Sequence, residues 1–161
     1  MPAFARLPIP ALLFGLACAP AIAADTGPPP APVARSAPAD PLAAARGHIQ
    51  AKNWANAIDE LKRVNASGSA DWNNLMGYAM RKQTTPDLDA SQRYYDVALR
   101  IDPKHMGTLE YSGELALIKG DLPTAEARLA TLSQLCNSPC ETLDELKKAI
   151  AKYKAGGKST Y

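Results

Sequence analysis

This 161-residue chain has few Phe and Trp residues and little excess of basic over acidic residues, which argues against two classes of protein. Only two Phe and two Trp are present, whereas a β-sandwich needs β-branched and aromatic residues in alternation. We therefore expect an all-α domain. Lys and Arg total 18 against 16 Asp and Glu, which leaves no excess of basic residues to track nucleic-acid phosphates. We expect no nucleic-acid partner.

Motifs that carry catalysis are also missing from the sequence. It contains no HExxH, no GxSxG, and no metal-spaced Cys/His cluster beyond one cysteine pair. The two histidines, His48 and His105, lie far apart in the sequence, and neither has a nucleophilic or acidic residue at the spacing of a known catalytic motif. We therefore expect no enzymatic activity, no catalytic residue, no cofactor and no metal site.

Long apolar runs are absent except near the start, where residues 9–18 are apolar and follow a single basic residue, Arg6. The run is too short to span a bilayer and is interrupted by proline. It ends in a small-x-small pattern that a signal peptidase accepts, so residues 1–24 are predicted to be a signal peptide cleaved after Ala23 or Ala24. The mature chain is then expected in the periplasm without a membrane span.

A second interpretation of this segment is lipidation. Cleavage before Cys18 would give an envelope lipoprotein anchored through that residue. Gly15 stands where a lipobox has an aliphatic residue, which disfavours this alternative. Residues 25–40 follow and consist mostly of Pro, Ala and small polar residues, with nothing to bury. They are predicted to form a disordered linker, and a Pro-rich ligand for a partner is the alternative.

Beyond the linker, four columns of residues recur at a spacing of 34. Each copy carries a large residue, then a small one, then further apolar residues, as on the packed face of a helix where a neighbour crosses closely. The columns are Trp54, Leu88 and Leu122; Ala57, Ser91 and Ala125; Leu61, Tyr95 and Leu129; and Val64, Ala98 and Leu132. Thirty-four residues is the period of a repeat built from two antiparallel helices.

Local motifs agree with this period. Residues 111–116 (YSGELA) and 120–125 (GDLPTA) place a glycine at a close helix crossing and a Gly-Asp turn before the second helix. Residues 75–79 (LMGYA) open the middle copy similarly, although Thr84–Asp87 lengthens its internal turn. The chain thus resembles the tetratricopeptide-repeat (TPR) family. The resemblance implies a short solenoid of about three antiparallel helix pairs, followed by a capping helix, over residues 41–155.

The resemblance also implies a function. TPR domains bind protein segments in a concave groove lined by the first helix of each repeat. The repeat register assigns eight residues to that groove: Arg46, Ile49, Asn74, Tyr78, Arg81, Glu110, Glu114 and Leu117. Their mixture of charges, one aromatic ring and apolar side chains suits a protein or peptide partner, although it does not reproduce the carboxylate clamp of chaperone-binding members. A purely solvated surface is the alternative.

The last predicted helix follows Ser138-Pro139-Cys140-Glu141, which has the form of a capping box with Ser138 at the N-cap. Leu143, Leu146, Ile150 and Tyr153 would line its packed face. Residues 156–161 are predicted to be a frayed tail.

Cys136 and Cys140 are the two cysteines that remain after signal cleavage, and they flank the turn before this helix. In an exported protein an even pair favours a structural disulfide. The alternative is a working thiol pair that handles electrons or a soft metal such as copper, with His105 and Met106 as further ligands. The ending resembles that of small exported bacterial TPR proteins. It implies a non-enzymatic interaction or scaffold protein of the bacterial envelope.

Overall fold

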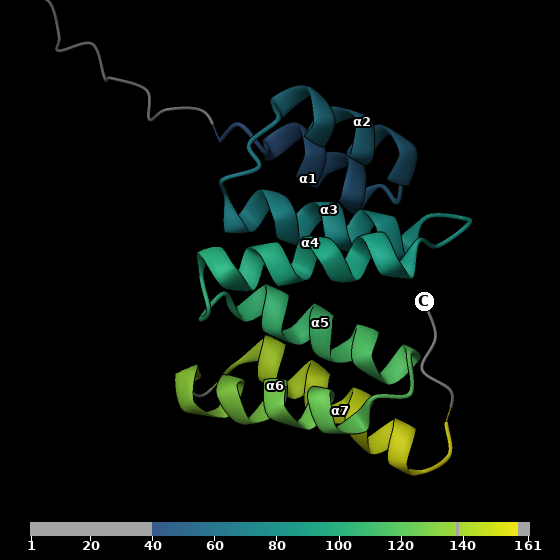
Figure 1. The fold of residues 1–161 in the computed structure, drawn as a ribbon, viewed down its shortest axis with the longest axis vertical. Helices are drawn as coiled ribbons and strands as arrows, with labels where there is room; N and C mark the ends of the chain where they lie inside the picture. Colours follow the sequence, from purple (N-terminus) through teal and green to yellow (C-terminus); the bar gives the residue numbers. More distant parts are fainter. Residues whose placement is uncertain (1–39, 138, 158–161) are drawn as a thin grey trace, which may run out of the picture. The chain divides into compact units, whose positions relative to one another are not determined.

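The computed structural model describes residues 40–137 and 139–157. The predicted signal peptide, nearly all of the predicted linker, Ser138 and the last four residues lie outside this range. Within it, the chain is all-α, as predicted, with seven helices and no strand. The helices are α1 (Ala43–Gln50), α2 (Trp54–Val64), α3 (Ala70–Lys82), α4 (Leu88–Ile101), α5 (Met106–Ile118), α6 (Leu122–Leu135) and α7 (Glu141–Lys154) (Figure 1).

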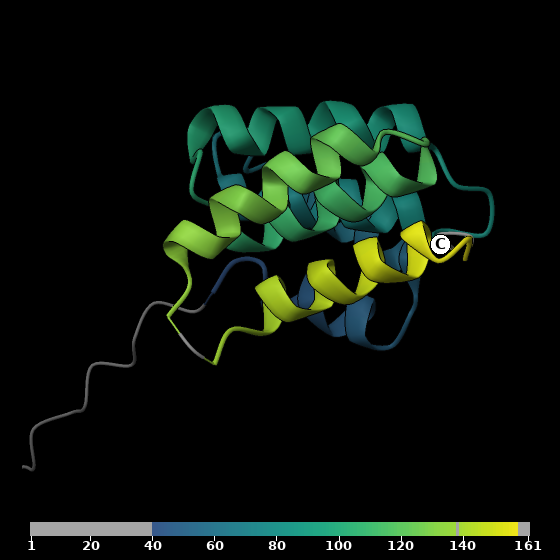
Figure 2. The ribbon, with the colours of Figure 1, turned by 90° about the horizontal axis from the view of Figure 1, so that it is seen from below.

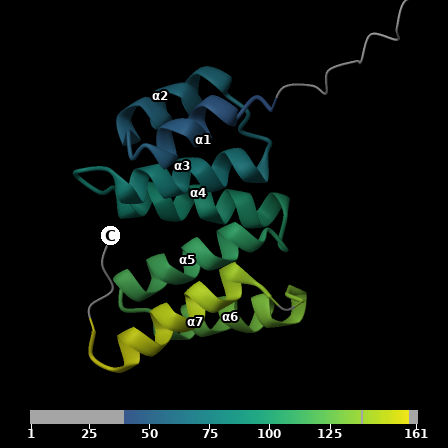
Figure 3. The ribbon, with the colours of Figure 1, turned by 180° about the vertical axis from the view of Figure 1, so that it is seen from behind.

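Helices adjacent in the sequence pack in pairs. Extensive contacts join α3 to α4, α5 to α6, and α1 to α2, and those between α5 and α7 are as extensive as those between α1 and α2; α3 also contacts both α1 and α5. The last helix, α7, packs against α5 and α6 (Figure 3). No helix in the described part of the chain is both long and apolar enough to cross a bilayer.

The 34-residue columns coincide with the second helix of each pair. The first column supplies the first residue of α2, α4 and α6. The small residues of the second column, Ala57, Ser91 and Ala125, are each 0 % exposed. Ser91 remains satisfied there because its hydroxyl donates to the carbonyl oxygen of Gly77 over 2.8 Å. The pattern therefore predicted which face these helices bury.

Two glycines permit close helix crossings, as the motifs predicted. A Cβ atom on Gly77 would lie 2.6 Å from the ring of Tyr95, which belongs to α4. A Cβ atom on Gly113 would lie 2.8 Å from both methyl groups of Leu146 on α7. Side chains fill the space that each missing Cβ leaves, so α3 packs tightly on α4 and α5 packs tightly on α7.

Capping by carboxylates starts two of the second helices. The side chain of Asp87 accepts a hydrogen bond from the amide of Ala90, and Asp121 accepts one from Thr124. Gly120 precedes Asp121 with φ of +82°, a conformation that glycine adopts without strain. The connection between α3 and α4, residues 83–87, is longer than the corresponding connections at residues 51–53 and 119–121. The chain thus accommodates the predicted insertion entirely in this turn.

The buried apolar residues form two clusters. One joins α1, α2 and α3 around Ala45, Leu61 and Met76. The other joins α5, α6 and α7 around Leu132 and Leu146. The predicted packed face of α7 is confirmed, because Leu146 and Ile150 are buried in the second cluster and Leu143 and Tyr153 pack against it. A single closing helix therefore covers the end of this second core.

Two boundary predictions need correction. The last helix begins at Glu141 with Cys140 at its N-cap and without a capping hydrogen bond from a side chain, so Pro139 is not its first residue. The backbone of Cys140 is extended, with φ of −142° and ψ of 100°, so helical geometry starts only after it. Asp40, assigned to the linker, belongs to the folded part: its carboxylate accepts from the amide of Leu42 over 2.9 Å and pairs with Arg46.

Candidate functional site

One cavity of about 310 Å³ lies on the face formed by α1, α3 and α5, and the start of α7 completes its wall. We call this space the inner cavity. In Figure 2, α7 passes on the same side of the helix stack as α1. The residues that line the inner cavity are Arg46, Ile49, Asn74, Leu75, Tyr78, Gly107, Glu110, Tyr111, Glu141 and Thr142.

The structure brings together five of the eight residues that the repeat register assigned to a groove. Arg46 and Ile49 reach the inner cavity from α1, Asn74 and Tyr78 from α3, and Glu110 from α5. These residues are separated by up to 64 positions in the sequence. The register therefore predicted their convergence, whereas binding of a partner stays a prediction.

The other three predicted groove residues lie elsewhere. Leu117 is 1 % exposed within the apolar core, so its assignment to the groove is wrong. Arg81 is 2 % exposed and donates from Nη2 to Oε2 of Glu114 over 2.7 Å, so its assignment as a groove residue available to a partner also needs correction. A long side chain at a groove position can fold back when a carboxylate on the first helix of the next pair lies within reach, as Glu114 on α5 does here.

Aromatic rings continue the inner face from α2 to α5. The Trp54 ring meets the Tyr78 ring edge-on, with centroids 5.9 Å apart. The Tyr78 and Tyr111 rings are tilted against each other at 4.6 Å. The guanidinium carbon of Arg81 lies 5.6 Å from the centroid of Tyr78 and 5.7 Å from that of Tyr111. Both tyrosines thus contact a cation that belongs to the chain itself.

The basic residue at the edge of the inner cavity is engaged by other side chains. Arg46 pairs with Asp40 at 3.4 Å and with Asp71 at 3.2 Å. Asp71 also accepts from Nε2 of His105 at 3.0 Å, and this hydrogen bond, followed by the charge of Arg46, lowers the pKa of Asp71. These contacts link α1, α3 and the residue before α5, so they brace the cavity edge.

Glu110 is the most perturbed acid in the described part of the chain. Burial of its carboxyl, followed by the nearby charges of Glu114 and Glu145, raises its pKa to about 8, while Arg81 opposes the rise. The residue is only 8 % exposed, and no hydrogen bond or ion pair from another described residue reaches its carboxyl group. The inner cavity therefore contains a largely buried acid whose carboxyl oxygens still reach the cavity and receive no hydrogen bond from the described chain.

Sequence reasoning missed five lining residues. Tyr111, Leu75 and Gly107 lie on α3 or α5 between or beside the assigned positions, so a finer helical register would have found them. Glu141 and Thr142 belong to α7, which lies outside the repeat, and no periodic signal in the sequence indicates where that helix folds back.

Cys136 and Cys140 form a disulfide in the structure, with their Cα atoms 5.8 Å apart. The bond joins the end of α6 to the start of α7. The Thr142 hydroxyl lies 3.5 Å from the Cys140 sulfur, and Thr142 also lines the inner cavity. The disulfide is thus located where it can fix the first turn of α7, which supplies one wall of the cavity.

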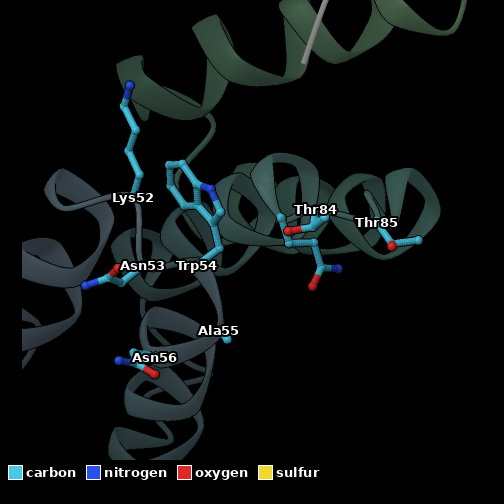
Figure 4. A pocket seen from close by; sticks show the side chains of 8 residues that line it. Lys52, Asn53, Trp54, Ala55, Asn56, Thr84 and Thr85 are labelled. Carbon is cyan, nitrogen blue, oxygen red and sulfur yellow. The ribbon is translucent and has the colours of Figure 1, made fainter.

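A second hollow lies where the α1–α2 and α3–α4 connections meet, and it is lined mainly by polar side chains (Figure 4). Its labelled side chains do not converge: Lys52 and Asn53 point away from Thr84 and Thr85. None of the predicted groove residues lines it. We therefore take the inner cavity, where aromatic and charged groups face a common space, as the candidate site.

The described residues contain no group of three or more His, Cys, Asp or Glu side chains arranged to hold a metal ion. His105, suggested as a soft ligand, instead caps α5 by accepting a hydrogen bond from the amide of Thr108.

The fold and site define an all-α protein of packed helix pairs with an acidic cavity lined by aromatic rings on one face. No protein-family model matches the chain. The curated proteins likewise contain no match to it.

Proposed function

We propose that the chain is a TPR-type interaction protein of the bacterial envelope, without enzymatic activity, which holds a protein segment in the inner cavity. One observation carries the proposal: residues from three successive first helices, chosen by their repeat register, line a single cavity. Binding across several repeats is how a helical-repeat surface recognises an extended chain.

The chemistry of the cavity supports this role. Ile49, Leu75 and the two tyrosine rings offer apolar contact, and Asn74, Glu110 and Glu141 offer polar contact. Binding sites commonly combine apolar and aromatic walls with a few polar groups that fix orientation. The volume of about 310 Å³ is close to the lower end of the usual range for binding pockets, roughly 300 to 1,000 Å³. The cavity is thus suited to one or two side chains of a longer segment.

The proposed location is the periplasm, reached through the signal peptide at residues 1–24. A disulfide between Cys136 and Cys140 agrees with an oxidising compartment. Anchoring as a lipoprotein through Cys18 is the alternative. Intact-mass measurement of the protein isolated from its host separates the two, because cleavage after Ala23 or Ala24 and lipidation at Cys18 leave different masses.

Site-specific photo-crosslinking in the producing cells tests the interaction. Benzoylphenylalanine replaces Arg46 at the cavity edge or, as a matched control, Arg63, an exposed arginine on α2 outside the cavity. We expect a protein adduct from position 46 and a weaker one or none from position 63. Equal adducts from both positions, or none from position 46, would contradict the proposal.

A blocking variant sharpens this test. Gly107 lines the inner cavity, and a Cβ atom there would lie 3.4 Å from Nδ2 of Asn74, an ordinary contact distance. Gly107→Leu should fill the cavity and abolish the adduct at position 46, whereas Gly107→Ala should retain it. Loss of the adduct in both variants would show that the adduct depends on local helix structure rather than on open space.

The alternative function, redox or copper handling by Cys136 and Cys140, is tested on the same purified protein. Thiol titration and elemental analysis should find no free thiol and no bound copper. Either finding would contradict a purely structural disulfide.

A further inference from the structure

Charge is unevenly distributed around the inner cavity. Two carboxylates, Glu110 and Glu141, line it, and neither forms an ion pair with a basic group of the described chain. The one basic residue of the lining, Arg46, is already paired with Asp40 and Asp71. The cavity therefore has acidic capacity that the described residues do not neutralise.

Glu110 is the acidic residue whose position in the cavity is most informative. It is 92 % shielded from solvent, lines the cavity, and receives no hydrogen bond from another described side chain or amide. Its carboxyl oxygens are not among the fully enclosed unpaired atoms, so they face the cavity, where a cation can donate charge-assisted hydrogen bonds to them. The Glu110 carboxyl is thus placed to bind a ligand rather than to stabilise the fold.

Another glutamate on the same helix already binds a cationic side chain of this chain. Glu114 lies four residues after Glu110 and hence on the same face of α5, one helical turn along. Glu114 accepts from Arg81, whose guanidinium also lies against the rings of Tyr78 and Tyr111. The same two tyrosines line the inner cavity beside Glu110, but the described chain supplies no arginine or lysine at that turn.

We propose that the inner cavity binds a lysine or arginine side chain from an extended basic segment of the partner protein, and that its cationic group donates to Glu110 against the tyrosine rings. The inference rests on the proposed function and names its partner chemistry. An acidic segment would bring like charge to Glu110 and Glu141, and an apolar one would leave Glu110 buried without a donor.

The protonation behaviour of the site agrees with a cationic ligand. The raised pKa of Glu110, about 8, means that the empty cavity holds a neutral acid at pH 7. The charged groups around it are Glu114 on α5, Glu141 and Glu145 on α7, Arg81 on α3 and Arg46 on α1. Tyr78 and Tyr111 stay neutral because burial raises the pKa of each. Cation binding should therefore release a proton from Glu110.

Calorimetric titration of the full mature protein with four heptapeptide libraries tests the proposal. The libraries differ only at the central position, which is Lys, Arg, Glu or norleucine. We expect the Lys and Arg libraries to bind on the order of tenfold more tightly than the norleucine library. Their affinity should also rise on the order of tenfold between pH 6 and pH 8, because the carboxylate form of Glu110 becomes available.

Two variants with the same Glu→Gln substitution complete the experiment. E110Q should lower the affinity for the Lys and Arg libraries to that for the norleucine library. It should also remove the dependence of their affinity on pH. E60Q, on α2 outside the cavity, should leave both unchanged. Circular dichroism verifies that each variant is folded, which we expect because Gln resembles the neutral Glu110.

The outcomes distinguish the two proposals. If no library binds, both the proposed function and the cationic ligand are overturned. If the libraries bind with equal affinity, if the Glu library binds best, or if E110Q behaves like E60Q, the cationic ligand alone is overturned. Spermidine that binds as tightly as the Lys library would assign the site to small amines and overturn the protein source.

Discussion

Glu114 and Glu110 lie one turn apart on α5, but their surroundings differ. At Glu114 the chain supplies its own cation, Arg81, and the buried arginine pairs with the partly exposed glutamate at 2.7 Å. At Glu110 the same helix faces an open cavity without a basic partner from the described chain. Glu114 thus belongs to a structural ion pair, whereas Glu110 is an acid without a basic partner from the described chain. The difference separates a position that stabilises the fold from one that is available to a ligand.

The largest predicted effect comes from removing the cation of the Arg81–Glu114 ion pair. Arg81→Met removes the buried cation, so Glu114 keeps a charge without a partner and the tyrosine rings lose their guanidinium. We expect a loss of about 3 kcal/mol in the free energy of unfolding, because the buried arginine loses its hydrogen bond and packing while the partly exposed Glu114 is left without its cation. Urea unfolding followed by tryptophan fluorescence measures it. Arg63→Met, at an exposed pair on α2, is the control and should unfold close to the wild type. Similar losses for both variants would contradict the role of Arg81.

The second prediction concerns Glu110 and the pH dependence of the free energy of unfolding. The pKa of Glu110 is about 8 in the folded chain and near 4.5 when unfolded, so the folded state holds the proton more tightly. Stability from this group is complete below pH 4.5 and is lost as the pH rises toward 8 and above. We expect the wild type to lose on the order of 3 kcal/mol relative to E110Q between pH 5 and pH 8.5. Parallel stability curves for the two proteins would contradict the perturbed acid.

The third prediction tests the packing that holds α7, and with it Glu141, against α5. Gly113→Ala would place a Cβ atom 2.8 Å from the Leu146 methyl groups, and the crowding should cost about 2 to 3 kcal/mol. Gly107→Ala lies on the same helix with its nearest neighbour at 3.4 Å and should be neutral or stabilising. Thermal unfolding compares the two. Equal melting temperatures would show that α7 is not closely packed at Gly113.

The smallest effect is expected from the disulfide. Replacing Cys136 and Cys140 by serine opens a short loop, so the loss of stability should stay below about 2 kcal/mol. The change should be local, with faster amide hydrogen exchange in the first turn of α7, including Thr142, and unchanged exchange in α3. Uniformly faster exchange throughout the chain would contradict a local role at the cavity wall.

The contrast between the two glutamates also shows what the sequence can predict. The 34-residue columns located the packed face of α2, α4 and α6 because burial on a repeated helix face imposes a period on residue size. The same register found five lining residues of the inner cavity. It could not tell Arg81 from an exposed cation, because that depends on a pairing distance to Glu114 rather than on spacing.

Elements outside the repeat were harder to predict. The packed face of α7 was evident from its apolar spacing, but its start was placed too early because Ser138-Pro139 resembles a helix cap. The return of α7 to the inner face, which brings Glu141 and Thr142 to the cavity, depends on packing between Gly113 and Leu146. Such a contact joins residues without a shared period, so a single sequence does not reveal it.

Carbon-13 NMR titration of the Glu110 carboxyl, alone and with a lysine-centred peptide, tests the central claim most directly. The open cavity predicts a titration midpoint near pH 8 for the free protein. Saturation with the peptide should lower that midpoint by at least about one unit, since a bound cation favours the carboxylate. A midpoint near the ordinary value of Glu, or one that the peptide leaves unchanged, would contradict the assignment of Glu110 as the cation-binding acid.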